Sequence, residues 1–495
     1  MLFNSVEFIL FFPAVVIGYF WIVPAAWRWL FLLLASCCFY MAFIPEYILI
    51  LLLTIGVDYA AGLWIEKSQG RRRSVGGEAA TGKILLWSSI LVTCAILFFF
   101  KYLDFAFSIF NQLRESFDVQ LSEQEKNRIG LYLPIGLSFH TFQSLSYVIE
   151  VYRGQQRAER HFGIYALYVL FFPQLVAGPI ERPQNLLHQF HETHFFNIPR
   201  AVSGLRLILW GAFLKTVVAD RLGLVVDAAY SDVPHASSEL LFLASVFFSF
   251  QIYADFQGYT CIARGAARVL GFELVKNFNR PYAAATVGEF WRRWHMSLST
   301  WFRDYVYLPL GGSRRGPWRS ALNLMITFLI SGLWHGANWT FLIWGGLNGI
   351  YVVIEKAIGL HWQRLRPLGV LVTYLLTLPA WVFFRADTVE TACKTLLQLP
   401  AGFLDLGARF FNGSILSESF FRSIKSSGEE LIIALTVFVL MEIGQFLEGE
   451  EDFGQLLAPC RWFSRWALYL TGLLIVLYSW MYFPESKKPF IYFQF

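Results

Sequence analysis

Charge is scarce in this sequence. Only 15% of its 495 residues are charged, whereas 56% are hydrophobic and 18% are aromatic. A soluble globular protein carries roughly 25% charged residues, so the deficit argues against that class. Apolar runs of about 20 residues recur along the chain, which is the length a helix needs to cross a bilayer. The composition therefore predicts an all-α polytopic membrane protein, surrounded by lipid.

Cysteine pairs and common nucleotide or hydrolase motifs are also missing. The six cysteines show no CxxC spacing, so neither a disulfide framework nor a metal site is expected. The sequence contains no GxSxG, Walker, HExxH or GxGxxG motif, which leaves hydrolase, ATPase, zinc-protease and dinucleotide-binding functions without support. The net charge of +5 comes without a basic stripe interleaved with aromatic residues, so no nucleic-acid partner is expected.

The apolar runs predict about eleven transmembrane helices, together with re-entrant and in-plane helices. The short basic loop 66–83 places its end of the bundle in the cytoplasm and the N-terminus outside. One integral-membrane domain is expected, with N-terminal helices in 1–130, a catalytic core in 131–358 and C-terminal helices in 359–495. The candidate spans are 6–23, 29–43, 47–64, 84–100, 165–177, 202–218, 240–253, 322–334, 340–358, 370–384, 431–446 and 466–483.

Three stretches do not fit a plain lipid-facing helix. Segment 131–151 carries several polar residues in an apolar frame, so it faces the bundle interior or is re-entrant. Segment 289–305 is too charged to span, and its aromatic residues recur at three- or four-residue steps, which predicts one amphipathic helix that is in-plane or re-entrant. Segment 388–430 is expected to be a long mixed loop with amphipathic character. His188, His191 and His194 have spacing that allows a metal, but a solvated loop is the favoured interpretation.

Two histidines that each follow a tryptophan mark the expected chemical centre. They are His295, after Trp294, and His335, after Trp334. An ionisable group at membrane depth is costly and indicates a functional site, and histidine exchanges protons near neutral pH. His335 is the candidate general base, although a core histidine bonded to a helix carbonyl would show the same pattern. His295 could orient His335, donate to an oxyanion or shuttle the proton, and a purely structural role fits its residues equally well.

Other polar residues near these pairs are candidate substrate-binding groups. Asp255, close to Gly258, suggests a polar break in or beside a helix, either as a wall of the reaction chamber or as a buried carboxylate paired with an arginine. Arg292 and Arg293 could attract the phosphates of a coenzyme A donor, or anchor the chain at the interface. The full candidate set is Trp334, Asn338, Asp255, Arg292, Arg293 and Ser299.

Longer motifs give the chain a family resemblance. They are residues 133–139 (LPIGLSF), 152–154 (YRG), 172–180 (FPQLVAGPI), 277–282 (NFNRPY), 289–301 (EFWRRWHMSLSTW), 303–305 (RDY), 310–312 (LGG), 332–338 (GLWHGAN) and 490–495 (FIYFQF). The chain resembles the membrane-bound O-acyltransferases, in particular the bacterial branch that contains the alginate O-acetyltransferase membrane subunit. It departs from that branch at 257–261, where QGYTC replaces a Ser-Gly-Tyr-Ser-Asp run and removes an acidic residue.

The resemblance implies a function and a site. Such a protein lies in the bacterial inner membrane, with a central tunnel through a helical core, and needs no bound cofactor. It moves an acetyl group from a cytoplasmic thioester, here acetyl-CoA, to a hydroxyl of an exported or cell-surface polysaccharide, often through an extracytoplasmic SGNH-like partner. The family's invariant histidine matches His335, and its second histidine matches His295. D-alanyl transfer from a carrier protein to teichoic acid, and a polysaccharide flippase without chemistry, are the alternatives.

Overall fold

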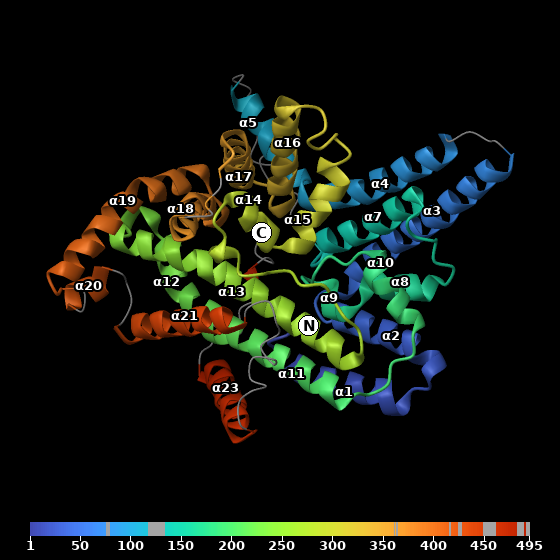
Figure 1. The fold of residues 1–495 in the computed structure, drawn as a ribbon, viewed down its shortest axis with the longest axis horizontal. Coiled ribbons are helices and arrows are strands. Elements are labelled where there is room, and N and C mark those ends of the chain that lie inside the picture. Colours follow the sequence, from blue (N-terminus) through green and yellow to red (C-terminus); the bar gives the residue numbers. More distant parts are fainter. Residues whose placement is uncertain are drawn as a thin grey trace. The chain divides into compact units, whose positions relative to one another are not determined.

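The computed structural model describes residues 1–75, 80–116, 134–360, 362, 365–414, 417–423, 428–448, 462–482 and 490–491. Throughout these residues the regular structure is helical, with no strand (Figure 1). The chain divides into two compact units. Unit 1 comprises Met1–Gly204 and Ala266–Val275, and unit 2 comprises Leu205–Gly265 and Lys276–Phe495.

Unit 1 is a helical bundle in which the third helix is central. Helix α3 packs against α4 and α7, and α2 packs against α8. The bounds are α1 (Val6–Ile17), α2 (Arg28–Met41), α3 (Ile48–Val75), α4 (Ala80–Lys101), α5 (Leu103–Ser116), α7 (Leu137–Arg153), α8 (Phe162–Leu170), α9 (Phe172–Leu175) and α10 (Pro183–Leu186), followed by a 3₁₀ turn (Leu187–His191).

The polar residues of α7 face the interior of this bundle. His140 is buried, and its Nε2 lies 3.3 Å from the Thr54 hydroxyl of α3. One turn further along α3, Asp58 accepts hydrogen bonds from Ser89 (2.6 Å) and Thr93 (3.1 Å) of α4. Polar groups at membrane depth are stable when neighbouring helices supply their partners. The interior-facing interpretation of this segment therefore holds for residues 137–151, whereas 131–133 lie outside the described residues.

Unit 2 contains most of the longest helix, α13 (Ser238–Leu270). Helix α11 begins in unit 1 and continues through a π-helical turn (Phe213–Ala219) into α12. Helices α16 and α17 pack against each other, and α17 packs against α18. The bounds are α11 (Ile198–Ala212), α12 (Asp220–Tyr230), α13 (Ser238–Leu270), α14 (Val287–Arg293), α15 (Met296–Phe302), α16 (Pro317–His335), α17 (Trp339–Ile358), α18 (Arg366–Arg385), α19 (Val389–Phe411), α20 (Glu418–Ser423), α21 (Gly428–Glu448) and α23 (Trp462–Tyr482).

Six helices among the described residues are long and apolar enough to cross a membrane: Pro45–Gly70, Thr81–Lys101, Ile198–Tyr230, Ser238–Leu270, Trp339–Ile358 and Arg366–Arg385. Shorter apolar helices occupy Val6–Ile22, Ala25–Met41 and Leu435–Gly444. The chain is therefore a multi-pass membrane protein, and the count of about eleven spans stays a prediction.

Three local expectations are wrong. The break expected near Asp255 does not occur, because α13 is continuous and its Gly258 packs closely against Gly211 of α11. The 388–430 loop contains the 23-residue helix α19, which begins at a Thr388 cap. The single helix expected over 289–305 is two helices, α14 and α15, followed by a π-helical turn (Arg303–Tyr307). The interruption between α14 and α15 contains one of the two candidate histidines.

Candidate active site

His335 is the last residue of α16, close to the point where glycines pack that helix tightly against α17. A Cβ atom on Gly332 would lie 2.3 Å from the Phe341 carbonyl oxygen, and one on Gly345 would lie 2.4 Å from the Phe328 carbonyl oxygen. Both positions therefore have to be glycine for the two helices to meet at this distance. The crossing fixes the end of α16 and, with it, the position of the His335 side chain.

The hydrogen bond of His335 determines which ring nitrogen is basic. Its Nδ1 lies 2.7 Å from the carbonyl oxygen of Ser331, one turn earlier in α16. A carbonyl only accepts, so Nδ1 carries the proton and Nε2 carries the lone pair of the neutral ring. This is the helix-carbonyl contact of an ordinary core histidine, but it also prepares Nε2 to act as a base.

His295 lies in the interruption between α14 and α15, in a left-handed backbone conformation with φ of +43°. Few non-glycine residues adopt this conformation, and it persists only where the surroundings impose it. Here the 277–279 segment does so through two backbone bonds. The Met296 N–H donates to the Asn277 carbonyl (2.8 Å), and the Asn279 N–H donates to the Arg293 carbonyl (2.9 Å). The turn interrupts the single helix that the aromatic spacing over 289–305 predicted.

The Asn277 side chain orients the His295 ring. Its Oδ1 lies 2.9 Å from His295 Nδ1 and also accepts from the Ser297 hydroxyl (2.9 Å) and the Ser297 N–H (3.3 Å). The backbone N–H of Ser297 can only donate, so the atom that faces it is the amide oxygen, and His295 Nδ1 is the protonated nitrogen. His295 thus has the same tautomer as His335. All three residues are at least nine-tenths buried.

Aromatic rings enclose both histidines. The Trp334 ring is common to the two, with its centroid 6.3 Å from His295 and 4.9 Å from His335. On the His295 side, Phe256 of α13 lies edge-on at 4.7 Å. On the His335 side, Trp344 of α17 lies at 4.6 Å and Phe384 of α18 at 5.6 Å. An apolar enclosure of this kind keeps water away from the two rings. A site that transfers an acyl group needs this exclusion of water, because water would hydrolyse the acyl donor.

Burial keeps His295 uncharged. It holds the pKa of the His295 imidazole well below its usual range, and the neighbouring His335 lowers it further. Desolvation disfavours a charged ring, and a second cationic group nearby would repel it. A neutral ring with its lone pair at Nε2 can accept a proton or position a second group that does so.

Asn277 allows a test of this arrangement. Replacing Asn277 with alanine is expected to lower kcat by roughly 10- to 100-fold, because a buried ring loses the hydrogen bond that orients it. Asn277→Asp keeps the acceptor and should retain more activity, but its carboxylate raises the pKa of His295. The neutral ring then forms only at higher pH, so the rise of the pH–activity profile should move upward. Asn279→Ala is the matched control. Equal losses in Asn277→Asp and Asn277→Ala, with no shift in the profile, would contradict this role.

Three of the predicted substrate-binding residues have local structural contacts. Asn338 caps α17 through the Thr340 N–H (3.1 Å) and donates to the Asp387 carbonyl (2.9 Å). The Ser299 hydroxyl donates to the Trp294 carbonyl (3.1 Å). Arg293 forms an ion pair with Glu289 (2.9 Å), whereas Arg292 is exposed. Substrate binding by these residues stays a prediction.

Asp255 belongs to a buried ion-pair cluster. Lys215, in the π-helical turn, lies 2.8 Å from the Asp255 Oδ1 and 2.9 Å from the Asp220 Oδ1. The second Asp255 oxygen accepts the backbone N–H of Ile491 at 2.6 Å. The partner of the carboxylate is thus a lysine and not the arginine that one sequence interpretation named. The preceding residue, Phe490, packs on Phe256, which also contacts Phe278 and His295.

Sequence reasoning missed several residues of this site. Asn277 stands in the 277–282 motif, but nothing in that motif indicates a contact with a histidine 18 residues later. Lys215 looks like an ordinary basic residue at the end of an apolar run. Trp344 and Phe384 look like lipid-facing aromatic residues, because only the packing of α16, α17 and α18 directs them to His335.

The three loop histidines do not converge on a metal. His191 pairs with Glu159 (2.7 Å), His194 Nε2 contacts the Gln189 carbonyl (2.9 Å), and His188 lies 4.0 Å from Glu192. Across the part of the chain that the structure describes, no group of three or more His, Cys, Asp or Glu side chains could hold a metal ion.

Two buried histidines of defined tautomer lie in an aromatic enclosure within a helical membrane protein. Comparison with known proteins identifies its class. The family model described as MBOAT, membrane-bound O-acyltransferase family, matches residues 161–376, which include both histidines. The chain is 36% identical over 397 residues to a probable alginate O-acetylase AlgI of Pseudomonas aeruginosa, covering 80% of this chain and 74% of that one.

Two further relatives differ in their named acceptors. A peptidoglycan O-acetyltransferase of Helicobacter pylori is 34% identical, over 80% of this chain and 79% of the relative. A teichoic acid D-alanyltransferase of Bacillus subtilis is 27% identical, over 43% of this chain and 56% of the relative. The chain belongs to the membrane-bound O-acyltransferase family. It is therefore an O-acyltransferase, and the flippase alternative is wrong.

Proposed function

We propose that this protein transfers an acetyl group from acetyl-CoA, on the cytoplasmic side of a bacterial inner membrane, to a hydroxyl of an exported polysaccharide. His335 acts as the general base. The observation that carries the proposal is the His335–Ser331 hydrogen bond, which leaves the basic nitrogen Nε2 within the aromatic enclosure. Relatives that cover four-fifths of this chain are named for O-acetylation.

Nε2 of His335 takes the proton of the acceptor hydroxyl while the hydroxyl oxygen attacks the thioester carbonyl. The tetrahedral intermediate then collapses, the C–S bond breaks, and the thiolate takes the proton back from Nε2. General-base catalysis of this type contributes typically about 10²–10⁴-fold. His295 either orients the reacting group, donates to the oxyanion after protonation or relays the proton.

The acceptor can receive the acetyl group directly or through a second protein. We propose an extracytoplasmic SGNH-like acetyltransferase as that partner, following the family resemblance. The D-alanyl alternative rests on a relative that covers less than half of this chain, and no feature of the site favours it over acetyl transfer.

The donor can be tested in membrane vesicles. Inverted vesicles that contain the protein, given acetyl-CoA labelled in the acetyl group, are expected to accumulate alkali-labile label on glycan. Vesicles with the His335→Gln variant should not. A parallel reaction with a D-alanyl-loaded carrier protein should yield no ester. Label transfer from the carrier, with none from acetyl-CoA, would instead establish D-alanyl transfer.

A further inference from the structure

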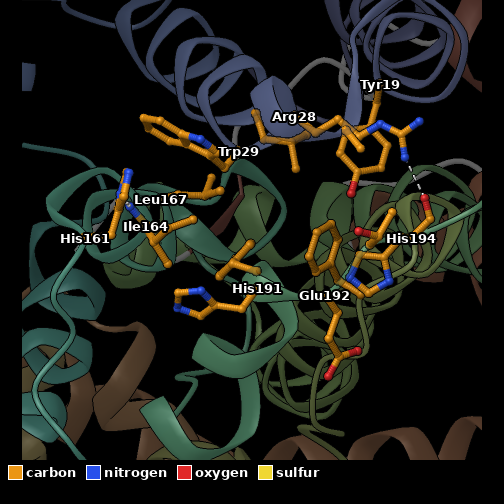
Figure 2. A pocket seen from close by; sticks show the side chains of 14 residues that line it. Tyr19, Arg28, Trp29, His161, Ile164, Leu167, His191, Glu192 and His194 are labelled. Atoms are coloured by element: carbon orange, nitrogen blue, oxygen red, sulfur yellow. Dashed lines mark hydrogen bonds between the residues drawn. The ribbon is translucent and has the colours of Figure 1, made fainter.

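The cavity in unit 1 does not include the two histidines of the reaction centre. Its volume is about 260 Å³, and Figure 2 shows the side chains that line it, among them His161, His191 and His194. Neither His295 nor His335 belongs to this lining. What shapes the enclosure around His335 is instead the packing of α14, α16 and α17, all in unit 2.

The wall beside His335 has two layers of tryptophan. The inner layer is Trp344 of α17, which is 1% exposed and has its ring centroid 4.6 Å from that of His335. The outer layer is Trp291 of α14, which is partly exposed and lies 5.5 Å from the Trp344 ring at an interplanar angle of 78°. Trp291 also contacts Phe328 of α16, at 5.6 Å. A movement of Trp291 would therefore uncover the ring that packs on the candidate base.

Asn348 of α17 holds the outer layer of this tryptophan wall. The residue is 2% exposed. Its Nδ2 donates to the Trp344 carbonyl oxygen one turn earlier (2.8 Å), and its Oδ1 accepts the indole N–H of Trp291 (3.2 Å). An indole can only donate and a carbonyl can only accept, so both bonds require the same orientation of the amide. Asn348 therefore ties the Trp291 side chain to the backbone of the residue that packs on His335.

A second residue of α17 fixes the start of α14. The Glu355 carboxylate, about two turns after Asn348, accepts the backbone N–H groups of Val287 and Gly288, the latter at 2.9 Å. The first turn of a helix leaves such N–H groups without a helical partner. Because α14 has only seven residues, these bonds and the one to Asn348 hold the helix on α17 at two points.

The position of the tryptophan wall matters because water competes with the acceptor. Nε2 of His335 is a base for any hydroxyl that reaches it, so water inside the enclosure would attack the thioester carbonyl in place of the sugar hydroxyl. Nε2 would take a proton from the water, the C–S bond would break, and the thiolate would recover that proton. The products would be acetic acid and the free thiol, and the acetyl group would be lost.

We propose that Asn348 is a positioning residue that keeps water from the reaction centre through its hydrogen bond to Trp291. It acts on the tryptophan wall and not on the substrate. Its loss therefore lowers the fraction of acetyl groups that reach the acceptor, more than the rate at which the thioester is cleaved. This inference rests on the proposed reaction of acetyl-CoA at His335.

The test measures both fates of the acetyl group in one sample. Inverted vesicles that contain the full-length protein receive acetyl-CoA labelled in the acetyl group, and ester on glycan and free acetate are counted separately. Vesicles with His335→Gln give the background hydrolysis, which is subtracted. Asn348→Leu keeps the branched shape of the side chain but removes both bonds, so the ratio of transfer to hydrolysis should fall about tenfold. The total thioester consumed should stay close to that of the wild type.

Trp291→Phe tests the same hydrogen bond from its other side. Phenylalanine keeps an aromatic ring but removes the indole N–H, so this variant should also show a lowered ratio. If both residues act through one bond, the double variant should lose no more than the larger single loss. Asn323→Leu is the matched control, because Asn323 is a fully buried amide in the N-terminal half of α16 that donates to the Gly312 carbonyl (3.0 Å). It should leave the ratio unchanged.

Several results would contradict the role of Asn348. An unchanged ratio in both Asn348→Leu and Trp291→Phe would overturn it, as would losses that add in the double variant or an equal loss in Asn323→Leu. If Asn348→Leu does not reach the membrane, Trp291→Phe decides alone. A wild type that moves no label from acetyl-CoA would refute the proposed donor together with this inference, whereas normal transfer with unchanged ratios would refute the inference only.

Discussion

Loss of acetyl transfer is the expected result of replacing His335 with glutamine. Glutamine fills most of the space of the imidazole but cannot take a proton, so the turnover number should fall by about 10²–10⁴-fold. His335→Ala should show the same loss. The measurement is ester-linked acetyl on the glycan, normalised to the amount of folded protein in the membrane. The loss should appear in kcat more than in KM, because the base acts after the acceptor is bound.

A structural role for His335 would give a different pattern. The ring packs against Trp344 and Phe384, so a histidine needed only for packing would be partly replaced by glutamine and not by alanine. His235→Gln, at an exposed position of the same unit, is the control for a general effect of histidine loss. Normal acetylation in His335→Gln membranes would mean that another group is the base.

The sequence identified the two histidines as candidate site residues because each is an ionisable residue in a largely apolar chain. An ionisable residue after a tryptophan, in a chain with 15% charged residues, is visible without coordinates. The polar face of α7 was visible for the same reason. Both predictions rest on the cost of polar groups at membrane depth, which is a local property that depends on composition.

Other features of the site depend on contacts between distant segments, which composition does not encode. The spacing of aromatic residues over 289–305 favoured one continuous helix, but the 277–279 segment bonds to Met296 and Arg293 and forces His295 into a left-handed turn. Tertiary hydrogen bonds override helical periodicity there. Gly258 was interpreted as a helix break, yet a glycine within a membrane helix also permits a close crossing, here with Gly211.

For Asp255, the sequence correctly indicated an unusual buried carboxylate, but the partner that it suggested was wrong. A carboxylate in an apolar helix needs a counter-charge, and the sequence suggested either an arginine or a substrate. The counter-charge is Lys215, which lies in the π-helical turn Phe213–Ala219. π-Helical turns are frequent at functional sites, but no residue pattern in this stretch predicts one.

The largest effect on stability is expected from Lys215→Met. Lys215 is the cation between two buried carboxylates, Asp220 and Asp255. Methionine keeps the length and apolar stem of lysine but leaves both acids without their shared counter-charge. Removing one partner of a buried ion pair costs about 3–5 kcal/mol, because the remaining charge stays desolvated. Reversible unfolding in mixed micelles would measure the change in the free energy of unfolding. Lys394→Met, in an exposed pair with Glu390, is the control and should change it by less than about 1 kcal/mol.

A triple variant separates charge from packing in this cluster. Adding Asp220→Asn and Asp255→Asn to Lys215→Met removes all three charges, and replacing a buried ionic cluster with neutral groups can be nearly neutral in stability. An amide oxygen at position 255 can still accept the Ile491 N–H, which preserves the contact beside Phe490. We therefore expect the triple variant to recover most of the stability lost in Lys215→Met, and to retain acetyl transfer because His295 keeps its contact with Phe256. Recovery of stability without recovery of transfer would mean that the Lys215 cluster has a role in the reaction and is not only a structural counter-charge.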